Sequence, residues 1–327
     1  MKKILVTGGA GFIGSHLVKH LLNMYPNYII VNVDSLTYAS NYKFIKDLED
    51  NSNYSFYKLD INETDTINNL FQKYNFDTVI NLAAESHVDN SIIKPGIFAK
   101  TNILGTINLL NIANQAWSGS NDSKNIFYQI STDEVYGSLG ITGSFTEKNR
   151  YSPRSPYSAS KASADHFVYA YSHTYNLPVL LSNCSNNFGP NQHEEKLIPK
   201  VVSCLINKSK IPVYGNGSNI RDWLFVEDHI SAIDLILHNG KNGESYNIGG
   251  GNELSNLDLV KQIIRIFHSN KEILDFNEYI DFVDDRKGHD FRYSIDYTKL
   301  KNDLGWTPKA DFFLSLQKTI NWYRNKK

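Results

Sequence analysis

The 327-residue chain has 41% hydrophobic residues and a formal net charge of −1, a composition typical of a globular protein that buries a sizeable core. It lacks the basic excess of a general nucleic-acid binder and any apolar run long enough to span a membrane. Cys184 and Cys204 are too few for a disulfide framework, and no Cys-x-x-Cys or His-Glu-x-x-His pattern predicts a metal site. We expect a cytoplasmic location, because the start Met-Lys-Lys resembles a signal peptide for only a few residues.

The first motif joins a buried strand at residues 2–7 to an apolar helix pattern. Glycines at 9, 11 and 14 have the dinucleotide-binding spacing, and Gly8, Gly11 and Gly14 have its wider variant. Such a turn lets a pyrophosphate approach the backbone and allows the helix to pack tightly on the strand. The free N–H groups at the helix N-terminus then bind the anion.

A second strand, residues 28–33, ends in Asp34 about twenty residues after the last glycine. A carboxylate there suits a ribose diol and repels a 2′-phosphate. No arginine follows immediately in Ser35, Leu36, Thr37 and Tyr38, so NAD is favoured over NADP. The alternative interpretation is that Asp34 is only a turn residue after a strand.

Strands and helices continue to alternate along the chain. We predict strands at 55–59, 78–82, 125–131 and 178–183, and helices at 64–74, 97–116 and 156–175. This alternation predicts an α/β fold with a doubly wound parallel sheet covered on both faces, a Rossmann-type NAD domain. The polar motif residues all follow strands, at the edge where ligands of such sheets bind.

After residue 183 the elements become shorter, which indicates a smaller mixed α/β substrate-binding lobe. A helix at 226–237 is expected to return to the main sheet. We therefore predict an NAD-binding domain of residues 1–182 plus about 219–243. The substrate-binding lobe then comprises about 183–218 plus 244–327.

Two further motifs predict a catalytic centre. Tyr157 and Lys161 lie one helical turn apart on one face, where the ammonium can stabilise a phenolate whose ordinary pKa is about 10. The pattern also occurs by chance on surface helices, so it needs its context. Asp133 and Glu134, directly after a predicted strand, add a possible acid and a possible base.

The motifs together resemble the extended short-chain dehydrogenase/reductases and, within them, the dTDP-glucose 4,6-dehydratases. The matching segments run nearly end to end, at residues 7–14, 36–39, 83–89, 131–137, 155–161, 183–187, 195–199, 221–223, 246–250 and 288–290. Sugar-nucleotide epimerases share the glycine and Tyr/Lys motifs but lack the Asp-Glu pair. The pair therefore favours the dehydratases.

The resemblance implies a hydro-lyase that oxidises C4 of the sugar, eliminates water across C5 and C6, and returns the hydride to C6. In that mechanism Tyr157 takes the C4 hydroxyl proton, Thr132 orients the hydroxyl, and Lys161 keeps Tyr157 ionised. Glu134 removes the C5 proton, and Asp133 protonates the departing C6 hydroxyl.

The resemblance also implies binding positions. Those for NAD are Gly8, Gly11, Phe12, Ile13, Gly14, Asp34, Ser35, Leu36, Thr37, Asp60, Ile61, Leu82, Ala83, Ala84, Ser86, Thr101, Tyr157, Lys161 and Asn187. Those for the nucleotide sugar are Ser86, Thr132, Asn186, Lys196, Leu197, Pro212, Val213, Tyr214, Arg221, Asn256, Arg286, Lys287, Gly288, His289 and Asp290. Arg221 and Arg286 suit a diphosphate; the alternative is surface ion pairs with Asp222 and Asp285.

The family further implies a homodimer formed by the helices at 97–116 and 156–175. Three departures border the sugar-nucleotide site: His193-Glu194, Asn90 and Lys287 replace the aromatic-proline, the arginine and the proline that are common there. They leave open the base preference, dTDP against UDP. The alternatives are a UDP-sugar 4-epimerase, a 4,6-dehydratase acting on another nucleotide sugar, and a non-catalytic NAD-sensing protein.

Overall fold

The computed structural model describes residues 2–119, 125–269 and 275–326, and at its centre lies a seven-stranded parallel sheet. The strand order is β10-β6-β5-β4-β1-β2-β3. The strands are β1 (Lys3–Thr7), β2 (Ile29–Asp34), β3 (Tyr54–Lys58), β4 (Thr78–Asn81), β5 (Ile126–Thr132), β6 (Val179–Cys184) and β10 (Ser245–Ile248). The order reverses between β1 and β4, so the predicted doubly wound fold is confirmed.

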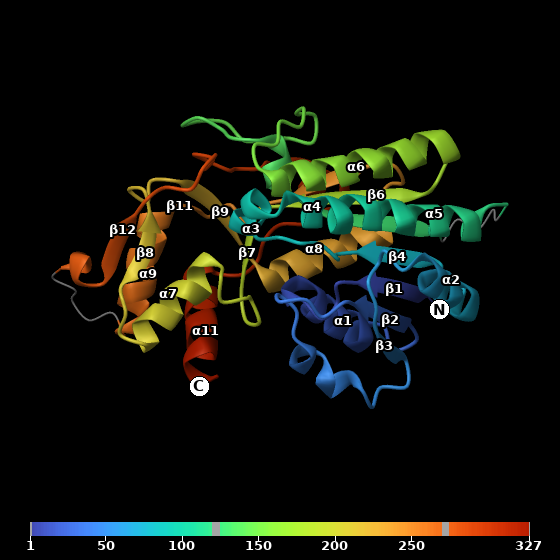
Figure 1. Ribbon diagram of the computed structural model, residues 1–327, viewed down its shortest axis with the longest axis horizontal. Coiled ribbons are helices and arrows are strands. Elements are labelled where there is room, and N and C mark those ends of the chain that lie inside the picture. The colour runs from blue at the N-terminus through green and yellow to red at the C-terminus, as the bar shows by residue number, and fades with distance from the viewer. Residues whose placement is uncertain (1, 120–124, 270–274, 327) are drawn as a thin grey trace.

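Helices cover both faces of this sheet (Figure 1). Because successive strand residues point to opposite faces, Ile4 and Val6 of β1 join one hydrophobic cluster and Leu5 joins the other. The first cluster contains the apolar sides of α1 (Phe12–Met24) and α8 (Val226–Asn239). The second contains those of α2 (Thr64–Tyr74), α5 (Gly105–Trp117) and α6 (Pro156–Tyr175).

The predicted helices 64–74 and 156–175 have these same bounds in α2 and α6, and the helical stretch expected near 97–116 is confirmed over residues 95–117, with a change of helix type inside it. There the chain forms α4 (Pro95–Phe98), a π-helical turn (Ala99–Leu104) and then α5. In this wider turn the buried Asn102 accepts from Glu85 N at 2.8 Å and donates to Ser160 Oγ at 2.8 Å. The turn thereby fixes the loop that follows β4, a role often found for π-turns near functional sites.

A smaller region packs beside the carboxyl edge of the main sheet (Figure 1). Its sheets are a three-stranded one, β11-β9-β7, and a pair, β12-β8. These strands are β7 (Asn186–Phe188), β8 (Ile211–Tyr214), β9 (Ile220–Phe225), β11 (Glu253–Ser255) and β12 (Ile280–Val283). The remaining helices are α3 (Val88–Ile93), α7 (Leu197–Ile206), α9 (Asn256–Phe267), α10 (Thr298–Leu304) and α11 (Phe312–Asn325).

The seventh strand of the main sheet, β10, comes from a segment that the predicted division assigns to the substrate-binding lobe. Its partner is β6, and the sheet therefore continues past the predicted boundary near residue 243. The predicted division also includes some residues outside the described part of the chain, namely 1, 120–124, 270–274 and 327. Among the described helices, none combines the length and the apolar character needed to cross a membrane.

Candidate active site

A cavity of about 530 Å³ opens at the carboxyl ends of the central strands. Its wall combines the loops after β1, β2, β4 and β5 with the start of α6 and the segment before α7. The predicted site residues that line it are Gly8, Gly11, Phe12, Ile13, Gly14, Asp34, Ser35, Thr37, Asp60, Ile61, Leu82, Ala83, Ala84, Ser86, Thr101, Thr132, Asp133, Glu134, Tyr157, Lys161, Asn186, Asn187 and Lys196. Strands distant in sequence thus bring all five predicted catalytic residues to one cavity.

The glycine turn forms one end of the cavity. Gly8 has φ +74°, and a Cβ there would lie 2.7 Å from Ala83 N. A Cβ on Gly14 would lie 2.2 Å from Gly8 O, so α1 packs directly on the turn. The N-cap residue Gly11 provides no side-chain cap, which leaves the first N–H groups of this 13-residue helix available to an anion.

Asp34 lies at the end of β2, 6% exposed, and its carboxylate organises the turn beside the glycines. Oδ2 accepts from Ala10 N at 2.9 Å and Oδ1 accepts from Leu36 N at 2.8 Å. Asp34 is therefore a turn residue, as the alternative interpretation proposed, and it also lines the cavity. Leu36 has φ +53° and does not contribute to the cavity lining.

Thr132, Asp133 and Glu134 follow one another where β5 ends and a 3-10 turn (Asp133–Tyr136) begins. Thr132 Oγ1 accepts from Glu134 N at 3.3 Å and caps this turn. Asp133 is 2% exposed, and burial, with the neighbouring charge of Glu134, raises the pKa of its carboxyl well above the ordinary value. Asp133 Oδ2 has no hydrogen-bond partner among the described residues.

Burial also raises the pKa of Glu134, but the positive charges of Lys196, Arg221 and Arg286 oppose the rise. The two adjacent carboxyls therefore have different electrostatic environments, with more nearby cations acting on Glu134. Adjacent carboxyls in different environments can take the separate roles of acid and base.

Tyr157 and Lys161 are both buried in the first turns of α6, which begins with a Ser155 capping box. Lys161 Nζ donates to the carbonyl oxygen of Ile130 in β5 at 2.7 Å. Burial raises the pKa of Tyr157 well above its usual value, Glu134 adds to the rise, and a hydrogen bond with the Thr132 hydroxyl opposes it. Burial also lowers the pKa of Lys161, and the nearby carboxylate of Asp165 opposes this change.

Sequence reasoning missed a buried carboxylate behind this pair. Asp165 lies one further turn along α6 and accepts from Ser131 Oγ at 2.5 Å. Burial raises its pKa to about 6, and the ammonium of Lys161 opposes the rise. The signal was present, since Asp165 continues the four-residue spacing of Tyr157 and Lys161.

Other residues that the prediction omitted also line the cavity. They flank the predicted motifs in sequence, which is the signal that was available for finding them. Among them are Ala39, Glu85, Lys100, Ser131, Cys184, Ser185, Gln192, His193 and Glu195.

Several predicted nucleotide-sugar residues lie outside the cavity lining, mostly around β8 and the loop after β12. They are Leu197, Pro212, Val213, Tyr214, Arg221, Asn256, Arg286, Lys287, Gly288, His289 and Asp290. Lys196, the residue before Leu197, does line the cavity, and its Nζ donates to Ser86 O at 2.8 Å.

Arg221 is held by main-chain oxygens. Its guanidinium donates to Ile220 O at 2.7 Å and Asp290 O at 3.0 Å, and lies 4.2 Å from the ring centroid of Tyr293. The alternative ion pair with Asp222 does not form, because that carboxylate accepts from two backbone N–H groups beyond β10. The positive charge of Arg221 lowers the pKa of both carboxyls of the Asp-Glu pair.

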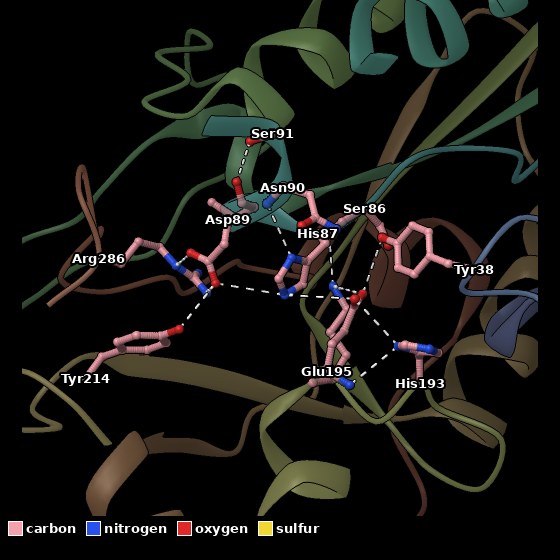
Figure 2. A network of polar contacts seen from close by, with 12 residues as sticks. Tyr38, Ser86, His87, Asp89, Asn90, Ser91, His193, Glu195, Tyr214 and Arg286 are labelled. Atoms are coloured by element: carbon pink, nitrogen blue, oxygen red, sulfur yellow. Dashed lines mark hydrogen bonds and ion pairs between the residues drawn. The ribbon is translucent and has the colours of Figure 1, made fainter. Parts of the chain in front are cut away.

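Arg286 pairs with Asp89 (Figure 2). The two contacts join Nε to Oδ1 at 2.6 Å and Nη2 to Oδ2 at 2.9 Å. The alternative partner Asp285 accepts from His289. The charge of Arg286 lowers the pKa of Asp89, so this carboxyl is ionised at neutral pH.

Comparison with known proteins places this arrangement among nucleotide-sugar dehydratases. The family described as GDP-mannose 4,6 dehydratase matches residues 5–319. A probable dTDP-glucose 4,6-dehydratase of Sinorhizobium fredii is 49% identical over 325 residues, which cover 98% of this chain and 92% of the relative.

Two solved structures resemble the chain over nearly its whole length. A dTDP-glucose 4,6-dehydratase of Bacillus anthracis in complex with NAD has 44% identity and a TM-score of 0.90, covering 100% of this chain and 98% of the other. A dTDP-glucose 4,6-dehydratase of Streptomyces venezuelae, also with NAD bound, has 41% identity and a TM-score of 0.92, covering 99% and 97%. This chain therefore belongs to the GDP-mannose 4,6 dehydratase family, among relatives named dTDP-glucose 4,6-dehydratase.

Proposed function

We propose that this chain is an NAD-dependent hydro-lyase that converts dTDP-glucose to dTDP-4-keto-6-deoxyglucose and water. The observation that carries the proposal is the adjacent Asp133 and Glu134 in the cavity that also holds Tyr157 and Lys161. Oxidation and re-reduction at C4 alone need no second acid and base, whereas elimination across C5 and C6 needs both. The names of the relatives support the same reaction.

The glycine turn, the uncapped start of α1 and Asp34 together fit NAD. The glycines leave space at the backbone for a pyrophosphate, and the helix N–H groups favour its charge. Asp34 disfavours a 2′-phosphate. When bound, NAD supplies the hydride acceptor and a positive charge that favours the phenolate of Tyr157.

Tyr157 takes the proton of the C4 hydroxyl, which Thr132 orients, and Lys161 supports the phenolate. The resulting keto group acidifies C5, and Glu134 removes the C5 proton. Asp133, kept protonated by burial, donates its proton to the C6 oxygen, which leaves as water. Return of the hydride to C6 and of a proton to C5 completes the product.

The predicted homodimer would cover apolar side chains that α3, α4, α5 and α6 leave exposed. These helices lie along one side of the molecule (Figure 1). The exposed side chains there include Ile93, Leu104, Phe167 and Tyr175. Large apolar side chains left exposed on neighbouring helices are what a subunit interface would cover.

Product analysis separates the dehydratase from the enzymes that resemble it. We expect purified protein to convert dTDP-glucose, with the loss of one water and a 4-keto-6-deoxy sugar seen by mass spectrometry and NMR, and to leave UDP-glucose unchanged. Conversion of UDP-glucose at unchanged mass would instead identify an epimerase. Loss of water from UDP-glucose would show a dehydratase with another base preference.

A non-catalytic NAD sensor is the alternative from another class. It has no need of four acid-base groups in one cavity, and all four are present. Retained NAD without turnover of any nucleotide sugar would favour the sensor over the enzyme.

A further inference from the structure

An ion pair beside the cavity connects a short helix to a loop, and its two residues lie 197 positions apart in sequence. Asp89, in the first turn of α3, binds Arg286, in the loop after β12 (Figure 2). Two charge-assisted contacts of 2.6 and 2.9 Å fix the plane of the guanidinium as well as its position. Asp89 thereby decides which way Arg286 faces.

Tyr214 completes the support of this arginine. Its hydroxyl donates to Asp89 Oδ2 at 3.3 Å, and its ring centroid lies 5.3 Å from Arg286 Cζ. The guanidinium is thus held at one edge by a carboxylate and on one face by an aromatic ring (Figure 2). A guanidinium has five N–H donors and Asp89 uses two, so three donors are left over; within the described residues Nη1 has no hydrogen bond.

Side-chain contacts connect the fixed guanidinium to the cavity wall. Asp89 Oδ2 lies 3.9 Å from His87 Nε2, which lies 3.9 Å from Glu195 Oε2, and Glu195 lines the cavity (Figure 2). In addition, the charge of Arg286 opposes the rise in the pKa of Glu134 and contributes to the lowered pKa of Lys196. Lys196 in turn contacts Ser86, which lines the cavity three residues before Asp89. Arg286 and Lys196 are therefore two cations at this end of the cavity, and a diphosphate has two charged phosphate groups for them to bind.

We propose that Asp89 is a positioning residue for substrate binding, holding Arg286 so that its remaining N–H donors meet the diphosphate of the nucleotide sugar. The proposal rests on the proposed function, because that function supplies the diphosphate. Asp89 itself does not touch the substrate. Its effect is preorganisation, since a free arginine would have to lose its side-chain freedom when the substrate binds.

The first test is the substitution Asp89→Asn, which keeps the shape but removes the charge and one of the two acceptors. We expect KM for dTDP-glucose to rise roughly tenfold, the scale of one lost charge-assisted hydrogen bond, while kcat changes less than about twofold. Unchanged KM would overturn the proposal. A lower KM would also overturn it, because it would mean that Asp89 competes with the diphosphate for Arg286.

A double-mutant cycle tests whether Asp89 acts through Arg286. In the Arg286→Gln background, Asp89→Asn should cause no further rise in KM. Additive effects of the two substitutions would contradict a positioning role. The matched control is Glu253→Gln, because Glu253 forms a pair of the same geometry with Arg292, at 2.6 and 2.8 Å, outside the cavity lining. This control should leave KM unchanged.

Binding measurements test the role of Asp89 without depending on turnover of the substrate. Each variant is titrated with dTDP and with UDP in a calorimeter. For Asp89→Asn we expect the affinity for the nucleotide to fall by the same factor of roughly ten, while the amount of retained NAD and the melting temperature stay unchanged. If the wild-type protein binds dTDP without converting dTDP-glucose, the proposed function fails and this binding comparison still decides the role of Asp89. Binding of neither nucleotide would overturn both.

Discussion

Burial decides the protonation states of the individual catalytic residues. Asp133, Glu134 and Tyr157 all have raised pKa values, with burial as the largest cause. The raised pKa of Asp133 suits its proposed role as the acid that protonates the leaving hydroxyl, and for Glu134 nearby cations limit the rise. The same burial makes Tyr157 depend on added positive charge. Identical side chains on a solvated surface would not have these roles.

Removing one carboxyl should separate the elimination from the oxidation. Asp133→Asn and Glu134→Gln should each slow product formation by about a hundredfold or more, because each removes one proton transfer of the elimination. Oxidation at C4 should remain detectable as an increase in reduced nicotinamide absorbance when dTDP-glucose is added. Unchanged turnover in both variants would show that this pair does not perform the elimination.

At the scale of elements, the connection from β1 to α1 depends on glycine for close approach. Gly14→Ala should lower the free energy of unfolding by about 1–3 kcal/mol and weaken NAD retention, because its Cβ would lie 2.2 Å from Gly8 O and 2.7 Å from Gly9 Cα. Gly140→Ala is the control, since a Cβ there meets nothing within 4 Å. Chemical denaturation and measurement of bound NAD compare the two; equal stability of both variants would contradict the tight packing.

The helix α8 is fastened to β7 by His229, whose Nδ1 lies 2.8 Å from Asn187 Oδ1. Burial lowers the pKa of His229 to about 3, so the unfolded chain takes up a proton below about pH 6.5 and the folded protein does not. Stability is therefore lost as pH falls from 6.5 towards 3.

The loss can be measured by denaturation at several pH values. Between pH 6.5 and pH 5 the wild-type protein should lose about 1.6 kcal/mol more stability than His229→Gln, which has no titrating ring. Replacing the exposed His173 by glutamine should preserve the wild-type dependence. A parallel pH dependence of the wild type and His229→Gln would show that His229 is not the group responsible.

Helices and strands are predicted well from the sequence where the local residue pattern agrees with the tertiary packing. The central strands are continuous apolar runs, α2 has an apolar face, and α6 begins with a capping box and a proline, so local pattern and tertiary packing agree. The π-turn at Ala99–Leu104 depends on hydrogen bonds of the buried Asn102 with distant residues, which no local period indicates. The four-residue strand β10 is defined by its partner β6 in the same way.

The same distinction between local sequence patterns and long-range contacts applies to the site. Fixed spacings within single segments relate the glycines to Asp34 and Tyr157 to Lys161. The sequence therefore predicts that these residues lie in one cavity. The partner of Arg286 is different. Asp89 lies 197 residues away, and only the folded arrangement shows that it, and not the neighbouring Asp285, pairs with the arginine.

For the whole molecule, the exposed apolar side chains of α3 to α6 lead to a prediction about assembly. Ile93 is 72% exposed and Leu104 is 57% exposed, and a stable dimer covers about 800 Å² on each partner. Light scattering should give twice the mass of the single chain, and Leu104→Arg should give a monomer. Ile141→Arg is the control, because Ile141 is 84% exposed but lies in the loop after β5. A monomeric wild type would contradict the predicted interface.

The central claim is that one active site oxidises C4, eliminates water and returns the same hydride to C6. The most direct measurement uses dTDP-glucose carrying deuterium at C4, with the product analysed by NMR and mass spectrometry. The account predicts a 4-keto-6-deoxy product that has lost one water and carries the deuterium at C6. Deuterium lost to solvent, or retained at C4 in a product of unchanged mass, would contradict it.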